Sequence, residues 1–437
     1  MSIKTHLPRL GALLLAAVLT GCGAAAAPAP SMAPETEAPT QEVWGLEVTE
    51  APAPTEAPGP AVTPSPSPTP APSPTPEPTP EPDPLEAAVQ ETLDRLTLEE
   101  KVAQLFVITP ESLAGTDSAA TAAGEATRSA FDTYPVGGLI YMGENLLSRD
   151  QAEEMLSATR SISRERIGLT PFLCVDEEGG TVARISGVEG FGIEGFPDMN
   201  EVGASGDPEQ ARSIGTEMGQ YLRDLGFNVD FAPVADVLTN SENTVVKYRS
   251  FGSDPETVTA MTAAFTQGLQ SQGVLGCYKH FPGHGGTAAD SHQGYAYADA
   301  TLEDLRQIDL VPFRDGAERQ VPFIMVGHIS LPGATAEDLP ASLSREMVTG
   351  ILREELGYEG IVITDGMNMG AISQNYSSAD GAVLAFEAGV DMILMPVSFR
   401  EAYHGILEAV ESGRISRERL DESLRRILRV KLRYLAE

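Results

Sequence analysis

The chain has 437 residues and a formal charge of −34 at pH 7, with 63 acidic side chains against 29 lysines and arginines. A surface this acidic repels phosphate backbones, which excludes proteins that bind nucleic acids. Three cysteines are too few for a fold that disulfides hold together.

The first 22 residues have the features of an export signal. Lys4 and Arg9 precede an apolar run, Leu10–Val18, that is too short to span a membrane as a stable helix. The run leads into Leu19-Thr20-Gly21-Cys22, which resembles the cleavage and lipidation site of bacterial lipoproteins. We therefore expect a lipid on Cys22 to hold an exported protein on the outer face of the cytoplasmic membrane. An ordinary secretory leader with a chance cysteine is the alternative.

Residues 23–84 form a second, compositionally distinct segment. Nineteen of the 33 prolines lie between Pro28 and Pro84, and this stretch contains no Lys or Arg. Such low-complexity sequence has almost nothing to bury, so we expect a disordered linker. Alternating prolines favour the polyproline II conformation, at roughly 3 Å per residue. The segment is then either a semi-rigid stalk or a passive linker.

Residues 85–437 have an ordinary globular composition. Thr97-Leu98-Glu99-Glu100 predicts a capping box at the start of a helix. Eight short apolar runs predict strands that are buried on both faces: Leu105–Ile108, Gly138–Tyr141, Phe172–Val175, Val229–Ala232, Val274–Tyr278, Phe323–Val326, Ile361–Thr364 and Met392–Met395. Helical patterns lie between them, among them Asp150–Arg160, Pro208–Leu225, Pro255–Gln272, Ser344–Leu356 and Ser416–Leu435. This alternation predicts an α/β fold with a single domain, a (β/α)8 TIM-type barrel. A doubly wound open sheet is the alternative.

Unusual polar residues follow several of the predicted strands. Asp176 comes directly after the third strand, Lys279 and His280 end the fifth, His328 follows the sixth, and Asp365 follows the seventh. A single acidic residue at such a position is often only a helix N-cap. In a barrel, however, all these positions lie on the C-terminal rim, where this fold builds its active sites. The repeated pattern therefore predicts a site on the rim.

The residue types narrow the chemistry of that site. Asp365 on its rigid strand suits a nucleophile, a general base or a metal ligand. One hypothesis is a metal site made by His280, His284, Asp290 and His292, although a proline and a glycine break the helix that would align the first two. The other is a proton-transfer pair, in which the Asp290 carboxylate orients the His292 imidazole. A carboxylate nucleophile facing an acid/base group is what a retaining glycosidase needs.

The segments around these positions resemble glycoside hydrolase family 3, specifically its single-barrel β-N-acetylglucosaminidase branch. The resemblance extends from about Leu96 to Leu435. It is carried by Val175–Gly180 with Arg184, Phe231–Val237, Arg249–Gly252, Lys279–Gly285 with Asp290–His292, and Thr364–Met367.

The resemblance implies a catalytic barrel at residues 85–437 and assigns roles within it. It implies that Asp365 is the nucleophile and that His292, paired with Asp290, is the general acid/base. It also implies that no metal or organic cofactor is needed. The residues that it places around the hydroxyl and acetamido groups of the sugar are Asp176, Arg184, Arg249, Lys279 and His280.

The implied activity is the release of non-reducing terminal N-acetylglucosamine from peptidoglycan fragments or chitooligosaccharides, by a protein that we expect to be monomeric. Two alternatives stay open. A neutral histidine as acid/base does not repel anions, so phosphate rather than water would attack the intermediate in a phosphorylase, with Arg249 or Lys279 as its partners. A non-catalytic lipoprotein that only binds cell-wall sugars is the other. Cys174 and Cys277 are interpreted as buried thiols, His284 as loop scaffolding and His328 as a buried, hydrogen-bonded histidine.

Overall fold

The computed structural model describes residues 83–287, 294 and 296–436. Eight parallel strands form its centre, in the order β10-β1-β2-β3-β4-β5-β7-β9. A bridge between Ile363 and Met392, with the Thr364 amide donating to the Met392 carbonyl at 3.1 Å, brings the two ends of the sheet together. The strands are β1 Phe106–Ile108, β2 Gly138–Ile140, β3 Phe172–Val175, β4 Val229–Asp230, β5 Leu275–Phe281, β7 Phe323–Val326, β9 Ile361–Thr364 and β10 Ile393–Leu394. The predicted (β/α)8 barrel is confirmed.

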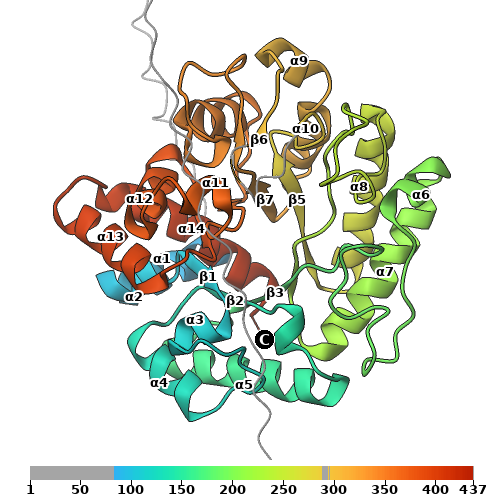
Figure 1. Ribbon diagram of the computed structural model, residues 1–437. Coiled ribbons are helices and arrows are strands. Elements are labelled where there is room, and N and C mark those ends of the chain that lie inside the picture. The colour runs from blue at the N-terminus through green and yellow to red at the C-terminus, as the bar shows by residue number, and fades with distance from the viewer. Residues whose placement is uncertain (1–82, 288–293, 295, 437) are drawn as a thin grey trace, which may run out of the picture. The chain divides into compact units, whose positions relative to one another are not determined.

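Helices surround the strands on the outside of the barrel (Figure 1). They are α1 Pro84–Arg95, α2 Leu98–Ala103, α3 Pro110–Ala114, α4 Glu125–Thr133, α5 Arg149–Ile167, α6 Met199–Ala204, α7 Pro208–Leu225, α8 Pro255–Ser271, α9 Leu302–Gln307, α10 Leu310–Glu318, α11 Gly370–Ser373, α12 Ser378–Ala388, α13 Phe399–Glu411 and α14 Arg417–Tyr434. Short 3₁₀ turns cover Gly143–Asn145 and Ala341–Leu343, and a two-stranded parallel sheet pairs β6 Ala296–Tyr297 with β8 Ile329–Ser330. None of the helices in the described ranges is both long and apolar enough to cross a membrane.

Local sequence signals explain where the helices begin and end. The capping box at Thr97 is present, with the Glu100 amide donating to the threonine hydroxyl and the Glu100 carboxylate accepting from the Thr97 amide. Helix α7 has Asp207 as its N-cap, a proline as its first residue, and Gly226 with a φ of 106° at its end. A left-handed φ of this size suits glycine, which has no Cβ to clash. These ends fix the length of the connections between strands and helices.

Several predicted elements differ from the structure in type or length. Helix α5 continues to Ile167 and strand β5 to Phe281, beyond the predicted ends at Arg160 and Tyr278. The segment expected to be a helix over Ser344–Leu356 is a π-helix over Glu346–Glu355. Strand β4 is only two residues long, but its contact with β5 continues beyond Asp230, because the Cys277 amide donates to the Ala232 carbonyl at 2.8 Å and a bridge joins Val234 to Lys279. The two cysteines of the barrel, Cys174 and Cys277, are free and buried, as expected.

Because all eight strands are parallel, their carboxyl ends meet on one rim of the barrel. Asp176 follows β3, Lys279 and His280 lie in the last residues of β5, and Asp365 follows β9. Residues that are far apart in the sequence therefore converge at this rim.

Candidate active site

A cavity of about 290 Å³ opens among the rim residues. Each candidate sugar-binding residue lines it, together with the candidate nucleophile: Asp176, Arg184, Arg249, Lys279, His280 and Asp365. Its volume is near the lower end of the range for small-molecule sites. The barrel therefore brings together, in one small pocket, those predicted site residues that lie within the described ranges.

Asp365 presents an ionised carboxylate to this cavity. Its Oδ1 accepts a hydrogen bond of 2.7 Å from the Gly366 amide. Burial raises the pKa of this carboxyl group, but His280, His328, the Gly366 amide and Lys279 more than offset burial and lower the pKa to about 2. The carboxylate is thus available as a base or nucleophile at neutral pH.

His328 fixes the turn that carries this carboxylate. It is fully buried, with Nδ1 2.7 Å from the Ser342 hydroxyl and Nε2 3.0 Å from the Gly366 carbonyl oxygen. Its interpretation as a buried, hydrogen-bonded histidine is confirmed. The imidazole therefore contacts the backbone of Gly366, directly after Asp365.

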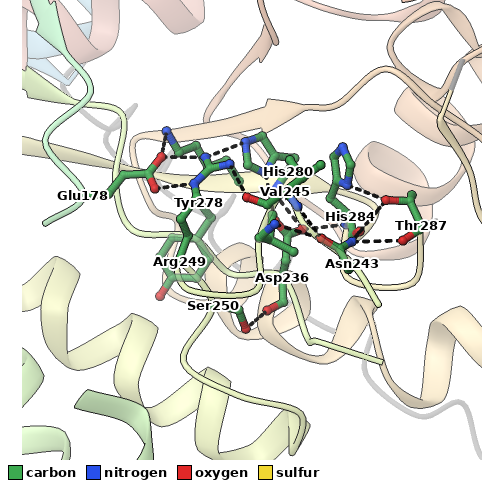
Figure 2. A network of polar contacts seen from close by, with 12 residues as sticks. Glu178, Asp236, Asn243, Val245, Arg249, Ser250, Tyr278, His280, His284 and Thr287 are labelled. Atoms are coloured by element: carbon green, nitrogen blue, oxygen red, sulfur yellow. Dashed lines mark hydrogen bonds and ion pairs between the residues drawn. The ribbon is translucent and has the colours of Figure 1, made fainter. Parts of the chain in front are cut away.

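A compact group of alternating charges forms the opposite wall of the cavity. Lys279 Nζ lies 2.8 Å from Asp176 and 2.6 Å from Glu178. Arg249 holds Glu178 through two hydrogen bonds of 2.7 Å each, as Figure 2 shows. Burial raises the pKa of Glu178, but the charges of Arg249 and Lys279 outweigh burial and hold this pKa well below its usual range. Pairing of this kind fixes the direction of each donor and acceptor.

His280 is oriented by a carboxylate beneath it. Its Nδ1 lies 2.7 Å from Asp236 Oδ2, while Oδ1 accepts the backbone amides of His280 and His284 at 3.1 and 2.6 Å. Asp236 has no solvent exposure, and its pKa is lowered by His280 and His284 despite its burial. With Nδ1 directed at Asp236, the Nε2 of His280 points toward the Arg249 guanidinium, 3.5 Å away (Figure 2).

The sequence of this barrel matches a known protein family. The family model described as the glycosyl hydrolase family 3 N-terminal domain matches residues 97–430, three quarters of the chain. The chain belongs to glycoside hydrolase family 3. Membership of this family makes it an enzyme of the glycoside hydrolase class.

Relatives in family 3 are named for action on amino sugars. The chain is 35% identical to the β-hexosaminidase LpqI of Mycobacterium tuberculosis, covering 77% of this chain and 83% of that protein. It is 34% identical to β-hexosaminidase A of Pseudoalteromonas piscicida, covering 68% of this chain but only 53% of that protein's length. A family 3 β-N-acetylglucosaminidase from Paenibacillus superposes with a TM-score of 0.72 at 38% identity, covering 78% of this chain and 63% of that one.

In this family 3 barrel, Arg184 differs from the other basic residues of the cavity. Its guanidinium makes no ion pair with another residue of the described ranges, and its Nε is buried without a hydrogen-bond partner. The backbone of its loop is held by Glu177, which accepts the amides of Arg184 and Ile185 at 2.6 and 3.0 Å. The loop thus positions a cation whose side chain remains available to a ligand.

His284 serves the structure of the loop after β5. Its Nδ1 lies 2.7 Å from the Thr287 hydroxyl, and its carbonyl accepts a hydrogen bond of 2.9 Å from Asn243 (Figure 2). Its interpretation as scaffolding agrees with these contacts, although its ring also faces the cavity, 5.8 Å from that of His280.

Some sequence-predicted residues lie outside the described ranges. These are the candidate acid/base His292, its partner Asp290 and the candidate lipidation site Cys22. Within the described ranges, no group of three or more His, Cys, Asp or Glu side chains is arranged to hold a metal ion.

Sequence reasoning missed two buried acidic residues of the site, Glu178 and Asp236. Glu178 is two residues after Asp176, a spacing that places both side chains on one side of an extended segment. That spacing was a usable signal. Asp236 gave no comparable signal, because its partner His280 is 44 residues away in the sequence.

Proposed function

We propose that the protein is a retaining exo-β-N-acetylglucosaminidase. The observation that carries the proposal is the position of an ionised Asp365 in a small pocket whose opposite wall consists of fixed cations and carboxylates. A sugar that contacts this wall through its hydroxyl groups would place its anomeric carbon near Asp365. The names of the family 3 relatives support N-acetylglucosamine as that sugar.

The proposed reaction has two displacements. In the first, a carboxylate oxygen of Asp365 bonds to the anomeric carbon while His292, stabilised by Asp290, donates its proton to the departing glycosidic oxygen. In the second, the neutral imidazole takes a proton from water, whose oxygen attacks the same carbon and releases Asp365. Two inversions return the original β configuration.

The described wall supplies the contacts that such a sugar needs. Asp176 accepts from hydroxyl groups, and Lys279 and Arg249 donate from directions that Glu178 fixes. Arg184 adds donors that are free of ion pairs within the described ranges. Apolar side chains also line the pocket, and an acetamido methyl group requires such a surface: Ile140, Met142, Val182, Val245, Met325, Met369 and Leu394.

The proposal includes the place and the substrates of the enzyme. A lipid on Cys22 would anchor a monomeric protein to the outer face of the cytoplasmic membrane, and residues 23–84 would separate the barrel from that anchor. Peptidoglycan fragments and chitooligosaccharides with non-reducing N-acetylglucosamine are the substrates expected there. Acylation of Cys22, read by mass spectrometry of the membrane fraction and abolished by Cys22→Ala, tests the anchor.

The test of activity compares a chromogenic β-N-acetylglucosaminide with the corresponding β-glucoside, first without and then with phosphate. We expect rapid release from the acetamido sugar alone, with free N-acetylglucosamine as product. A phosphate-dependent rate with a sugar 1-phosphate as product would instead identify a phosphorylase, and preference for the glucoside would contradict the sugar assignment.

A second arm tests the nucleophile. Asp365→Ala should lower kcat by at least about a thousandfold, since the covalent route is lost. Asp338→Asn, an exposed carboxylate outside the cavity, is the matched control. A 5-fluoro glycosyl fluoride of N-acetylglucosamine should label the peptide that contains Asp365, as read by mass spectrometry. Sugar binding without turnover in the parent enzyme would indicate a receptor.

A further inference from the structure

A second cavity, of about 430 Å³, adjoins the first and shares three lining residues with it: Met142, Asn368 and Met395. Its remaining walls come from the segments after β1, β2 and β10, which are separated from β5 and its Lys279 by β3 and β4. The two cavities are therefore neighbouring compartments of one continuous rim surface.

The orientation of a bound substrate follows from the positions of the residues that would hold the sugar. The residues that suit sugar hydroxyl groups follow β3 and β4 or end β5, whereas Asp365 follows β9, next to β10. A sugar held by Asp176 and Lys279 in the first cavity, with Asp365 on one face of its anomeric carbon, directs its leaving group away from Asp365 and out of that cavity. The second cavity is a neighbouring space that could receive the leaving group, because it shares Met142, Asn368 and Met395 with the first. This step rests on the proposed function.

The walls of the two cavities differ in charge. The first contains Arg184, Arg249 and Lys279, whereas no Lys or Arg of the described ranges lines the second. Three carboxylates line the second cavity instead: Glu111, Asp117 and Glu144. Glu111 is fixed by the Asn145 side-chain amide at 3.0 Å and the Ala120 amide at 3.3 Å, while the other two are exposed to solvent.

The second cavity also has an apolar surface. Met142 and Met395 lie at its border with the first cavity, and Val397 is 65% exposed beside them. Side chains of this kind pack against the C–H face of a pyranose ring, while Asn368 offers an amide to its hydroxyl groups.

We propose that this second cavity is the subsite for the leaving-group sugar and that it discriminates by charge. It accepts a neutral sugar or one with a free amine and disfavours one with a free carboxylate, because the carboxylate would face three like charges in a cavity that no Lys or Arg of the described ranges lines. Of the two proposed substrate classes, chitooligosaccharides then fit better than fragments whose leaving group is a muramic acid with a free lactyl carboxylate.

The test uses three disaccharides with the same non-reducing N-acetylglucosamine and different leaving groups: N-acetylglucosamine, glucosamine, and N-acetylmuramic acid. In the full-length enzyme at low salt, we expect kcat/KM to be at least threefold lower for the muramic acid substrate than for either of the others. The difference should shrink at high salt, since charges this exposed are screened.

Glu144→Lys should raise the ratio of kcat/KM for the muramic acid substrate to that for the neutral one by at least threefold. The matched control is Glu217→Lys, an exposed reversal on α7 outside both cavities, which should leave the ratio unchanged. Equal ratios in the two variants, or a salt-independent ratio, would overturn the subsite. If the parent enzyme cleaved none of the three disaccharides, the proposed function would fail first and the subsite with it.

Discussion

Asp309 is a buried carboxyl group that we expect to lower stability at neutral pH. It is the N-cap of α10, yet its side chain accepts no hydrogen bond from the first turn of that helix. It is only 5% exposed, and its Oδ1 has no hydrogen-bond partner in the part of the chain that the structure describes. It packs instead against Gly283, where an added Cβ would lie 2.7 Å from Oδ1. A buried carboxylate with an oxygen that lacks a hydrogen-bond donor is costly when ionised.

The sign and size of the effect follow from its pKa. Burial, then the negative charge of Asp236 and, to a smaller extent, Asp304, raise the pKa of Asp309 from 3.8 to about 7. The folded state therefore binds the proton of Asp309 more tightly, so the contribution of this group to stability is fully present below about pH 4 and is lost as the pH rises to about 7. The difference corresponds to a penalty of roughly 4 kcal/mol above that pH. Asp309→Asn keeps the shape and removes the charge, and therefore the penalty.

Calorimetric melting at pH 4, 6 and 8 tests this reasoning. We expect the Asn variant to exceed the parent Tm by on the order of 5–10 °C at pH 8 and to match it at pH 4. Asp338→Asn, at an exposed position, removes the same charge and controls for net charge. A gain that is the same at all three pH values, or a variant less stable than the parent at pH 8, would refute the argument.

Two further substitutions test how the site is held together. Glu178→Gln leaves Arg249 and Lys279 without their shared counter-charge, so we expect a loss of about 3–5 kcal/mol in unfolding free energy and a KM at least about tenfold higher; an unchanged KM would contradict the role of that pairing. Asp236→Asn removes the acceptor that sets the tautomer of His280, and kcat/KM should fall by about 10- to 100-fold while the Tm changes less. A parent-like kcat/KM with a lowered Tm would make Asp236 purely structural.

The barrel was predictable because each strand is an apolar run bounded by clear breaks. Phe172–Val175 and Ile361–Thr364 match the predicted strands residue for residue, and helix α7 occupies the predicted Pro208–Leu225. The π-helix at Glu346–Glu355 was not predictable, because apolar spacing does not distinguish i→i+4 from i→i+5 hydrogen bonding over three turns.

The site was predictable where chemistry coincides with a strand end. Asp365 and Lys279 stand out because a charged residue follows or ends an apolar strand. Asp236 does not, since its importance comes from the barrel register: the Ala235 amide donates to the Lys279 carbonyl at 2.7 Å, which places Asp236 beneath His280. Pairings between strands are set by tertiary structure, and one sequence alone does not reveal them.

The ion pairs of the cavity bear on the choice between water and phosphate as the attacking group. A phosphate dianion needs cations that are not already neutralised. Arg249 and Lys279, the partners considered for phosphate, are both held by Glu178, and Lys279 also by Asp176. Among the Lys and Arg residues of the described ranges that line the cavity, only Arg184 makes no ion pair, and the ionised Asp365 lines the same cavity. The charges that the described residues bring to the cavity are balanced for a neutral, hydroxyl-rich ligand, which supports the proposed hydrolysis over phosphorolysis.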